Sequence, residues 1–360
     1  MKIKDIGTVV TGKTPQTSHA EYYGGKYMFV TPTELHGGYK VSHAEKTITE
    51  EGLNSIKSNT IDGTSVLVGC IGWDMGNVAM CFDKCASNQQ INSITNISED
   101  YNPFYLYYWL CTKKEYLFSI ASVTRTPILS KGVFEEIEIP EIKREDQDKV
   151  ADVLLAIDKK IEANTAINDN LQQMAHTAYM HLFFNKPANG RISDILIENS
   201  KSSIQVGEAK DVDGDYPFFT SGDAVLCWPE FLVDGRNCYL NTGGNAGVKY
   251  YVGKAAYSTD TWCISAREGL ADYLYLLLDS IKQELSQKYF QGTGLKHLQK
   301  PILKDRPIYI PSSTELESFN QSVVPWLTLI SDNIRESQRL TLLRDWLLPM
   351  LMNGQATIID

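Results

Sequence analysis

The sequence lacks the features that mark membrane, secreted and metal-dependent proteins. No apolar run in the 360 residues approaches the roughly 20 that a membrane-spanning helix needs. The opening segment, MKIKDIGTVV, lacks the profile of a signal peptide. The seven cysteines are odd in number and include no CxxC pair, which argues against a disulfide framework or a zinc site. We therefore expect a cytoplasmic protein with no membrane contact and no metal site.

An excess of basic charge is also missing. The chain has 34 Lys and Arg against 44 Asp and Glu, and no domain of it is basic overall. This excludes strong sequence-independent binding to phosphates by the chain alone, so any contact with nucleic acid needs local patches or a basic partner. The hydrophobic content of 43% and the charged content of 22% are typical of a globular protein long enough for two domains.

The most informative feature is an internal repeat whose second copy begins about 170 residues after the first. Several short matches occur in the same order in both copies, and each is weak alone. They are DG at 62–63 with DG at 234–235, GNV at 76–78 with GV at 247–248, YLY at 105–107 with YLY at 273–275, LSK at 129–131 with LQK at 298–300, and IEIP at 137–140 with IYIP at 308–311. A duplicated fold suits a target that also has two parts. The alternative is an old duplication in which one copy is now only structural.

Each copy has a strand-rich part followed by a helical part. The strand-rich parts, residues 1–139 and 191–311, have short β-branched and aromatic runs between Gly-rich turns. This composition predicts compact domains of mixed α/β type. The helical parts, residues 140–190 and 312–360, carry apolar residues at heptad spacing.

The heptad spacing predicts a coiled coil. Residues 141–184 form a predicted helix about 65 Å long, with Asn164 and Asn168 at seam positions where asparagine fixes register. A similar helix is predicted after Pro311, with a kink or a break at Pro325. We expect the two helices to pair antiparallel, because the chain must run out and back between the duplicated domains.

Residues 7–14, GTVVTGKT, match the phosphate-binding pattern GxxxxGK[ST] letter for letter. That pattern requires a buried strand before the loop and a helix whose amides point at phosphate after it. Here Pro15 follows directly and the next stretch has no helical periodicity. A nucleotide-binding enzyme is therefore the less favoured alternative. The six histidines show no metal spacing and no nucleophile–histidine–acid set stands out, so we predict no catalytic residue and favour a binding module.

Two loops that recur in both copies are candidates for contact with DNA. One is locally basic and suits phosphate contacts, although a solvated helix face is an equal alternative for any single lysine. The other pairs SNQQ at 87–90 with STDT at 258–261; its Asn, Gln, Ser, Thr and Asp side chains can bond base edges, or can instead cap a turn. The candidate residues are Lys13, Thr14, Asn88, Gln89, Gln90, Thr124, Arg125 and Lys131 in the first copy and Ser258, Thr259, Asp260, Lys296, His297 and Lys300 in the second.

Over essentially its whole length the chain resembles the specificity (S, HsdS) subunit of type I restriction–modification systems. The resemblance rests on five segments in chain order: IGTVVTGKTP, YYGGKYMFVTPTEL, SNQQIN, LSKGVFEEIEIP leading into KVADVLLAIDKKIEANTAINDNLQQMA, and LRDWLLPMLMNGQ. It implies an α+β fold in which two target-recognition domains are joined by two long helices that form an antiparallel coiled coil. Each domain is then expected to read half of a split DNA sequence, with half-sites about one DNA turn, near 10 base pairs, apart.

The resemblance also implies partners for the chain. The partners are double-stranded DNA, two modification methyltransferase subunits and a restriction subunit. S-adenosylmethionine, ATP and Mg are expected in those partner subunits and no cofactor in this chain. A scaffold that binds protein rather than DNA remains the alternative.

Overall fold

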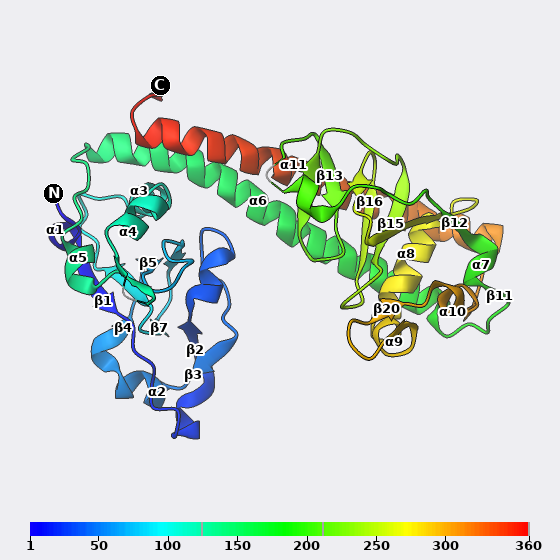
Figure 1. Cartoon of the computed structure of the whole chain (residues 1–360), viewed down its shortest axis with the longest axis horizontal. Coiled ribbons are helices and arrows are strands. Elements are labelled where there is room, and N and C mark those ends of the chain that lie inside the picture. Colours follow the sequence, from blue (N-terminus) through cyan, green and yellow to red (C-terminus); the bar gives the residue numbers. More distant parts are fainter. Residues whose placement is uncertain (124, 211, 359–360) are drawn as a thin grey trace. The chain divides into compact units, whose positions relative to one another are not determined.

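The computed structural model describes residues 1–123, 125–210 and 212–358. They form two compact units. Unit 1 comprises Met1–Lys160 and Leu340–Asp360, and unit 2 comprises Ile161–Arg339. Each unit contains one strand-rich part and a stretch of both long helices, α6 and α11 (Figure 1).

Unit 1 is built on two four-stranded sheets. One has the order β1-β8-β5-β6 and is antiparallel throughout; the other has the order β3-β2-β7-β4, in which β2 and β7 run parallel. The strands are β1 (Thr8–Thr11), β2 (Tyr23–Val30), β3 (Lys46–Ile48), β4 (Thr60–Ile61), β5 (Ser65–Gly69), β6 (Val78–Cys81), β7 (Cys85–Ser87) and β8 (Ile91–Thr95), with a separate hairpin of β9 (Ser122–Val123) and β10 (Pro127–Ile128). The helices are α1 (Ile3–Ile6), α2 (Glu50–Ser55), α3 (Pro103–Cys111), α4 (Lys114–Ser119) and α5 (Lys131–Glu135).

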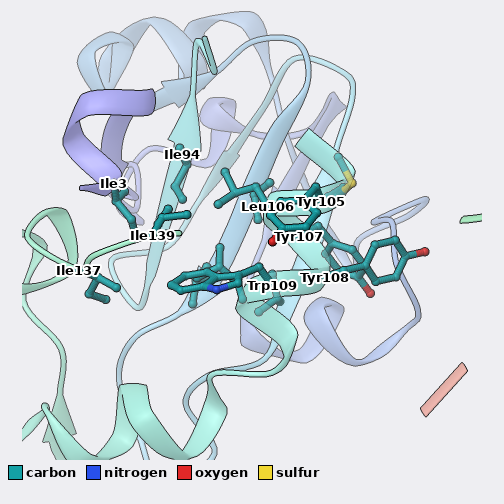
Figure 2. Close-up of a cluster of buried hydrophobic side chains, with 14 of the residues drawn as sticks. Ile3, Ile94, Tyr105, Leu106, Tyr107, Tyr108, Trp109, Ile137 and Ile139 are labelled. Carbon is teal, nitrogen blue, oxygen red and sulfur yellow. The ribbon is translucent and has the colours of Figure 1, made fainter. Parts of the chain in front are cut away.

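The main core of unit 1 lies between the antiparallel sheet and α3. Figure 2 shows the side chains of α3 gathered near Ile94 of β8, Ile3 of α1 and Ile139. The side chains labelled in Figure 2 are buried, and burying one such side chain stabilises a fold by about 1.5–3 kcal/mol. Asn102 starts α3 by accepting hydrogen bonds from the backbone N–H of Phe104 at 2.8 Å and Tyr105 at 3.2 Å. The cluster therefore holds α3 on the sheet in a defined orientation.

Unit 2 repeats this plan. Its antiparallel sheet has the order β12-β18-β15-β16, and a three-stranded sheet β14-β13-β17 again contains a parallel pair, β13 with β17. The strands are β12 (Leu196–Glu198), β13 (Tyr216–Phe219), β14 (Val225–Trp228), β15 (Arg236–Asn241), β16 (Val248–Val252), β17 (Ala256–Tyr257) and β18 (Thr261–Ala266), with the pairs β19 (Phe290–Gln291)/β20 (His297–Leu298) and β11 (Gly190–Arg191)/β21 (Pro307–Ile308). The helices are α7 (Ile192–Ile195), α8 (Ala271–Ser280), α9 (Lys282–Glu284) and α10 (Lys300–Lys304). In Figure 1, α8 lies in front of β15, matching the place of α3 in unit 1.

Backbone pairing confirms the duplication and corrects one of the sequence matches. Lys2 bridges Glu138 in unit 1, and the corresponding pair in unit 2 is Arg191 with Pro307. Ile139 therefore has its equivalent in Ile308. The sequence match of IEIP with IYIP is therefore two residues out of register. Both segments have isoleucine at alternate positions before proline, and a shift of two residues keeps the side chains on the same faces of the strand.

The two long helices are α6 (Arg144–Tyr179), which continues into a single π-helical turn over Met180–Phe184, and α11 (Ser313–Met352). The sequence predicted a kink or a break at Pro325. The break is wrong, because α11 is helical on both sides of the proline and through it. Val323 and Leu327 are both buried on either side, and this packing offsets the roughly 3 kcal/mol that an internal proline costs. No helix among the described residues is long and apolar enough to cross a membrane.

Hydrogen bonds between the helices show that they pair antiparallel. In unit 2, Asn164 Nδ2 donates to Glu336 Oε2 at 2.8 Å, and Asn333 Nδ2 donates to Asn168 Oδ1 at 2.8 Å. Residue numbers therefore rise along α6 where they fall along α11, as in an antiparallel pair. The prediction that Asn164 and Asn168 serve the helix pair is confirmed, because both amides are bonded across it.

A capping box holds the start of α11. The Ser312 backbone N–H and hydroxyl both donate to Glu315 Oε2, at 2.9 and 2.8 Å, and Tyr309 donates to the same oxygen at 2.8 Å. Lys186 forms an ion pair with the carboxylate. The hydrogen bond from Lys186, followed by those from Ser312 and Tyr309, lowers the pKa of Glu315 from 4.5 to about 2.

Glu315→Gln is expected to make the protein less sensitive to acid. Because the folded pKa of Glu315 lies below its ordinary value, its contribution to stability is present above pH 4.5 and is lost as the pH falls towards about 2. Urea unfolding at pH 7 and at pH 3 measures this: the parent should exceed the variant in stability at pH 7, and the difference should shrink at pH 3. A difference independent of pH would contradict the assignment.

Candidate nucleic-acid interface

In unit 1 the segment Asn88–Gln90 follows directly after β7 and is shaped by backbone hydrogen bonds. The N–H of Asn88 donates to Val30 O at 3.0 Å, and the N–H of Cys70 donates to Gln90 O at 2.7 Å. Asn88 Nδ2 donates to Gln90 Oε1 at 2.9 Å, while Asn88 Oδ1 accepts from the Gln90 N–H at 3.0 Å. These two side chains thus hold each other in place, and Gln89 between them is exposed.

The loop after β1 lies against this segment. The N–H of Gly12 donates to Ile91 O at 3.0 Å, and a side chain at Gly12 would place its Cβ only 2.1 Å from Asn88 O. Only glycine permits that approach. The hydroxyl of Thr14 donates to Gln89 Oε1 at 3.0 Å, and Lys13 is exposed. The structure therefore brings Thr14 and Gln89, which the sequence analysis selected separately, into direct contact.

The hairpin of β9 and β10 joins the same edge of unit 1. The N–H of Gly72 donates to Pro127 O at 3.0 Å, and the N–H of Leu129 donates to Cys70 O at 2.8 Å. Arg125 is exposed in the turn, and Lys131, at the start of α5, forms an ion pair with Glu135 at 3.5 Å. Thr124, also predicted, lies outside the described residues. We call residues 12–14, 70–76, 88–90, 122–123 and 125–128 the edge loops of unit 1.

Unit 2 builds the same edge with the same backbone bonds. The N–H of Ser258 donates to Phe219 O at 2.9 Å, and the N–H of Thr242 donates to Asp260 O at 3.1 Å. The N–H of Gly244 donates to Lys296 O at 2.9 Å, as that of Gly72 does to Pro127. Residues 242–247, 258–260 and 291–297 are the edge loops of unit 2.

These bonds shift one predicted correspondence by a single residue. Ser258 occupies the place of Asn88, not of Ser87, because each is the residue whose N–H bonds the parallel strand. The Ser258 side chain is fully buried and its Oγ lies 2.9 Å from Thr261 Oγ1. It therefore serves the turn and offers no atom to a base in this conformation, whereas Asp260 is exposed and Thr259 half-buried.

The basic residues of unit 2 divide into two groups. Lys296 and His297 are exposed in the hairpin. Lys300 lies with its Nζ 4.9 Å from the ring centroid of buried Trp262, and burial lowers the pKa of Lys300. Lys300 therefore covers the core with its stem and presents its ammonium at the surface.

The nucleotide-site alternative is contradicted by the structure. Residues 8–11, which would have to wrap around phosphate, form β1 and pair with β8. No helix opens in the described stretch between Gly12 and His19. The amides that a phosphate loop directs at its ligand are here committed to a sheet. The described residues also contain no group of three or more His, Cys, Asp or Glu able to hold a metal ion.

Sequence reasoning did not select the loops 70–76 and 242–247, although their backbones join the other edge loops together. The available signal was glycine: Gly72 has a φ of +108° and Gly244 a φ of +76°, and each donates its N–H to the hairpin. A backbone geometry repeated in the two units, rather than side-chain chemistry, marks these positions.

A family model described as the type I restriction modification DNA specificity domain matches residues 1–173 and 188–334. The chain belongs to this family. The resemblance inferred from the sequence is thereby confirmed, and the chain is a specificity subunit, a component for DNA recognition rather than an enzyme.

Similar proteins of known sequence or structure agree. The specificity subunit of the type I restriction enzyme MjaIX from Methanocaldococcus jannaschii is 25% identical, over 99% of this chain and 93% of its own. That of HindI from Haemophilus influenzae is 32% identical, but over only 38% of this chain and 30% of its own. The crystal structure of the S subunit from M. genitalium superposes with a TM-score of 0.63 at 16% identity, covering 98% of this chain and 95% of that one. The predicted fold of duplicated α+β domains with paired long helices is confirmed.

Proposed function

We propose that this specificity subunit reads a DNA target in two parts, one half through the edge loops of each unit. The observation that carries the proposal is the repetition of the edge: the same backbone bonds present different side chains in the two units. In unit 1 these are Asn88–Gln90, and in unit 2 they are Thr259 and Asp260. Side chains that differ on one framework are what two readers of different half-sites require.

The residues of the edge loops divide by the contacts they can make. Gln89, Gln90, Thr259 and Asp260 carry the donors and acceptors that read base edges. The cations in and beside the edge loops suit phosphates and would orient each unit on the duplex; they are the exposed Lys13, Arg125, Lys131, Lys296 and His297 and the half-buried Lys300. Thr14 supports Gln89 through its hydrogen bond.

We further propose that the chain acts in a complex with two modification methyltransferase subunits and a restriction subunit. S-adenosylmethionine, ATP and Mg are then supplied by those subunits, and methylation of adenine occurs in trans. The net charge of −10 supports this arrangement, because a reader without a basic surface needs partners that add affinity for phosphate. The paired helices would set a spacing of about 10 base pairs between the half-sites.

The decisive experiment is to map DNA methylation in cells that express this chain with and without its neighbouring methyltransferase. We expect a split motif that appears only when both are present. A motif produced by the methyltransferase alone, or no motif in either condition, would contradict the proposed function. The second result would favour the scaffold that binds protein, which pull-down with the methyltransferase would then test.

A further inference from the structure

Two large apolar side chains stand out by their exposure. Trp73 is 70% exposed and Leu295 is 65% exposed, the two highest values for large apolar residues in the described part of the chain. Leaving such a side chain in water forgoes about 1.5–3 kcal/mol of burial. A single exposed apolar residue needs no explanation, but two beside corresponding loop junctions of a duplicated fold do.

Both residues lie where the same two edge loops are joined. Trp73 follows Gly72, whose N–H donates to the hairpin at Pro127 O, 3.0 Å away. Leu295 precedes Lys296, whose carbonyl accepts from the N–H of Gly244 at 2.9 Å. In unit 1 the loop between β5 and β6 supplies the apolar residue, and in unit 2 the hairpin of β19 and β20 supplies it. The junction is therefore the same although the donor loop differs.

Polar and basic residues lie near both side chains, and the ring of Trp73 also lies 6.1 Å from that of Phe118. The loop that carries Trp73 is bonded to Gln90 through Cys70, and Arg125 is exposed in the joined hairpin. Leu295 is followed by exposed Lys296 and His297. In unit 1 the hairpin also exposes Val123 and Ile128, whereas Leu295 is the one exposed large apolar residue in the edge loops of unit 2. An exposed apolar side chain beside cations and amides suits the groove of DNA, where it can contact a thymine methyl or wedge between base steps.

We infer that Trp73 and Leu295 contact bases of the half-sites read by unit 1 and unit 2, respectively, and help to specify them. This inference rests on the proposed function. The indole of Trp73 is wide and flat, while Leu295 is compact, so the two units present different apolar shapes beside the same loop junction. The contacts add affinity without releasing counterions, unlike those of the neighbouring lysines.

The test uses the full chain in complex with its methyltransferase and a duplex that carries the methylated motif. Trp73→Ala is expected to weaken specific binding about 10-fold or more, the range for loss of one base–aromatic contact, and Leu295→Ala to weaken it several-fold.

Neither variant should change the dependence of affinity on salt, whereas Lys296→Ala should reduce the slope of log affinity against log salt concentration by about 1. Trp73→Phe should restore part of the affinity. In methylation maps, each alanine variant should relax bases in one half of the motif only.

Matched controls are Phe82→Ala and Phe231→Ala, which remove exposed aromatic side chains away from the edge loops. Phe82 follows β6 and Phe231 precedes β15, whereas the edge loops lie at the other ends of these strands. Thermal unfolding checks that all variants keep the fold. A parent that methylates a split motif, with Trp73→Ala and Leu295→Ala indistinguishable from it, would overturn this inference alone. Loss of assembly with the methyltransferase at unchanged DNA affinity would also overturn it. A parent with no split motif would overturn the proposed function and this inference together.

Discussion

Replacing residues 191–311 with the matching segment of a related specificity subunit is expected to change one half of the methylated motif completely and leave the other half unchanged. Every backbone bond that builds the edge loops of unit 2 joins residues inside this segment, including Phe219, Thr242, Ser258 and Lys296. The edge loops of unit 1 use none of them. The half-site should therefore travel with the segment.

The exchange must preserve the packing of the segment on the helices. Phe319 and Val323 of α11 are fully buried in the same cluster as Tyr273 and Leu274 of α8, so a donor with matching residues at these positions is required. A smaller chimera that transfers only residues 258–260 and 291–299 is the matched control, and it should change the same half of the motif. A change in both halves, or in neither, would show that the units do not read separately.

Asp158→Ala is expected to destabilise unit 1 by about 3 kcal/mol. Asp158 is buried on α6, where its Oδ1 accepts from Arg344 Nη1 of α11 at 2.8 Å and its Oδ2 accepts from the Tyr108 hydroxyl of α3 at 2.6 Å. One carboxylate thus ties three helices together. Removing it leaves a partly buried guanidinium and a buried hydroxyl without this partner.

The electrostatics of this group support a large effect. Although burial opposes its charge, the hydrogen bonds that Arg344 donates to Asp158 and Asp345 raise its pKa, so the cation persists at any working pH. Burial, with the hydrogen bond to Asp158, raises the pKa of Tyr108 and keeps it a donor. Arg344 retains Asp345 at 2.8 Å and is a quarter exposed, which places the cost at the lower end of the 3–5 kcal/mol range for broken buried pairs.

Urea unfolding measures the loss, and hydrogen exchange locates it. In Asp158→Ala the amides of residues 340–352 should exchange faster, because this end of α11 loses its bond to α6. Tyr108→Phe is the control: it removes one hydrogen bond and should cost about 1–2 kcal/mol without loosening α11. Equal exchange rates in Asp158→Ala and the parent would mean that apolar packing by Leu347 and Leu351 holds the helix alone.

Local patterns predicted much of the architecture. The pairing of LSK at 129–131 with LQK at 298–300 survives in the structure, where Leu129 and Leu298 each donate an N–H to the equivalent loop. Heptad spacing also predicted the helix pair and the role of Asn164 and Asn168. These features depend on residues close together in the chain, and periodicity reports them directly.

Proline and register were harder to predict. Pro325 lies inside a continuous helix because Val323 and Leu327 pack on both sides of it, and that packing involves residues distant in sequence. The correspondence of Ser258 with Asn88, one residue away from the predicted match with Ser87, has a similar cause. Hydrogen bonds to Val30 and Phe219 on neighbouring strands set the register, and a one-residue slip reverses which side chains face outward.

By itself the sequence determined the family, the duplication, the mixed domains and the paired helices, because these follow from composition, order and spacing along the chain. Only the tertiary structure decided which candidate side chains reach solvent. It buries Ser258, stacks Lys300 over Trp262 and exposes Trp73 and Leu295 beside the other edge loops. The physical reason is that exposure at these loops is set by backbone bonds between segments more than fifty residues apart, such as Gly72 with Pro127 and Gly244 with Lys296.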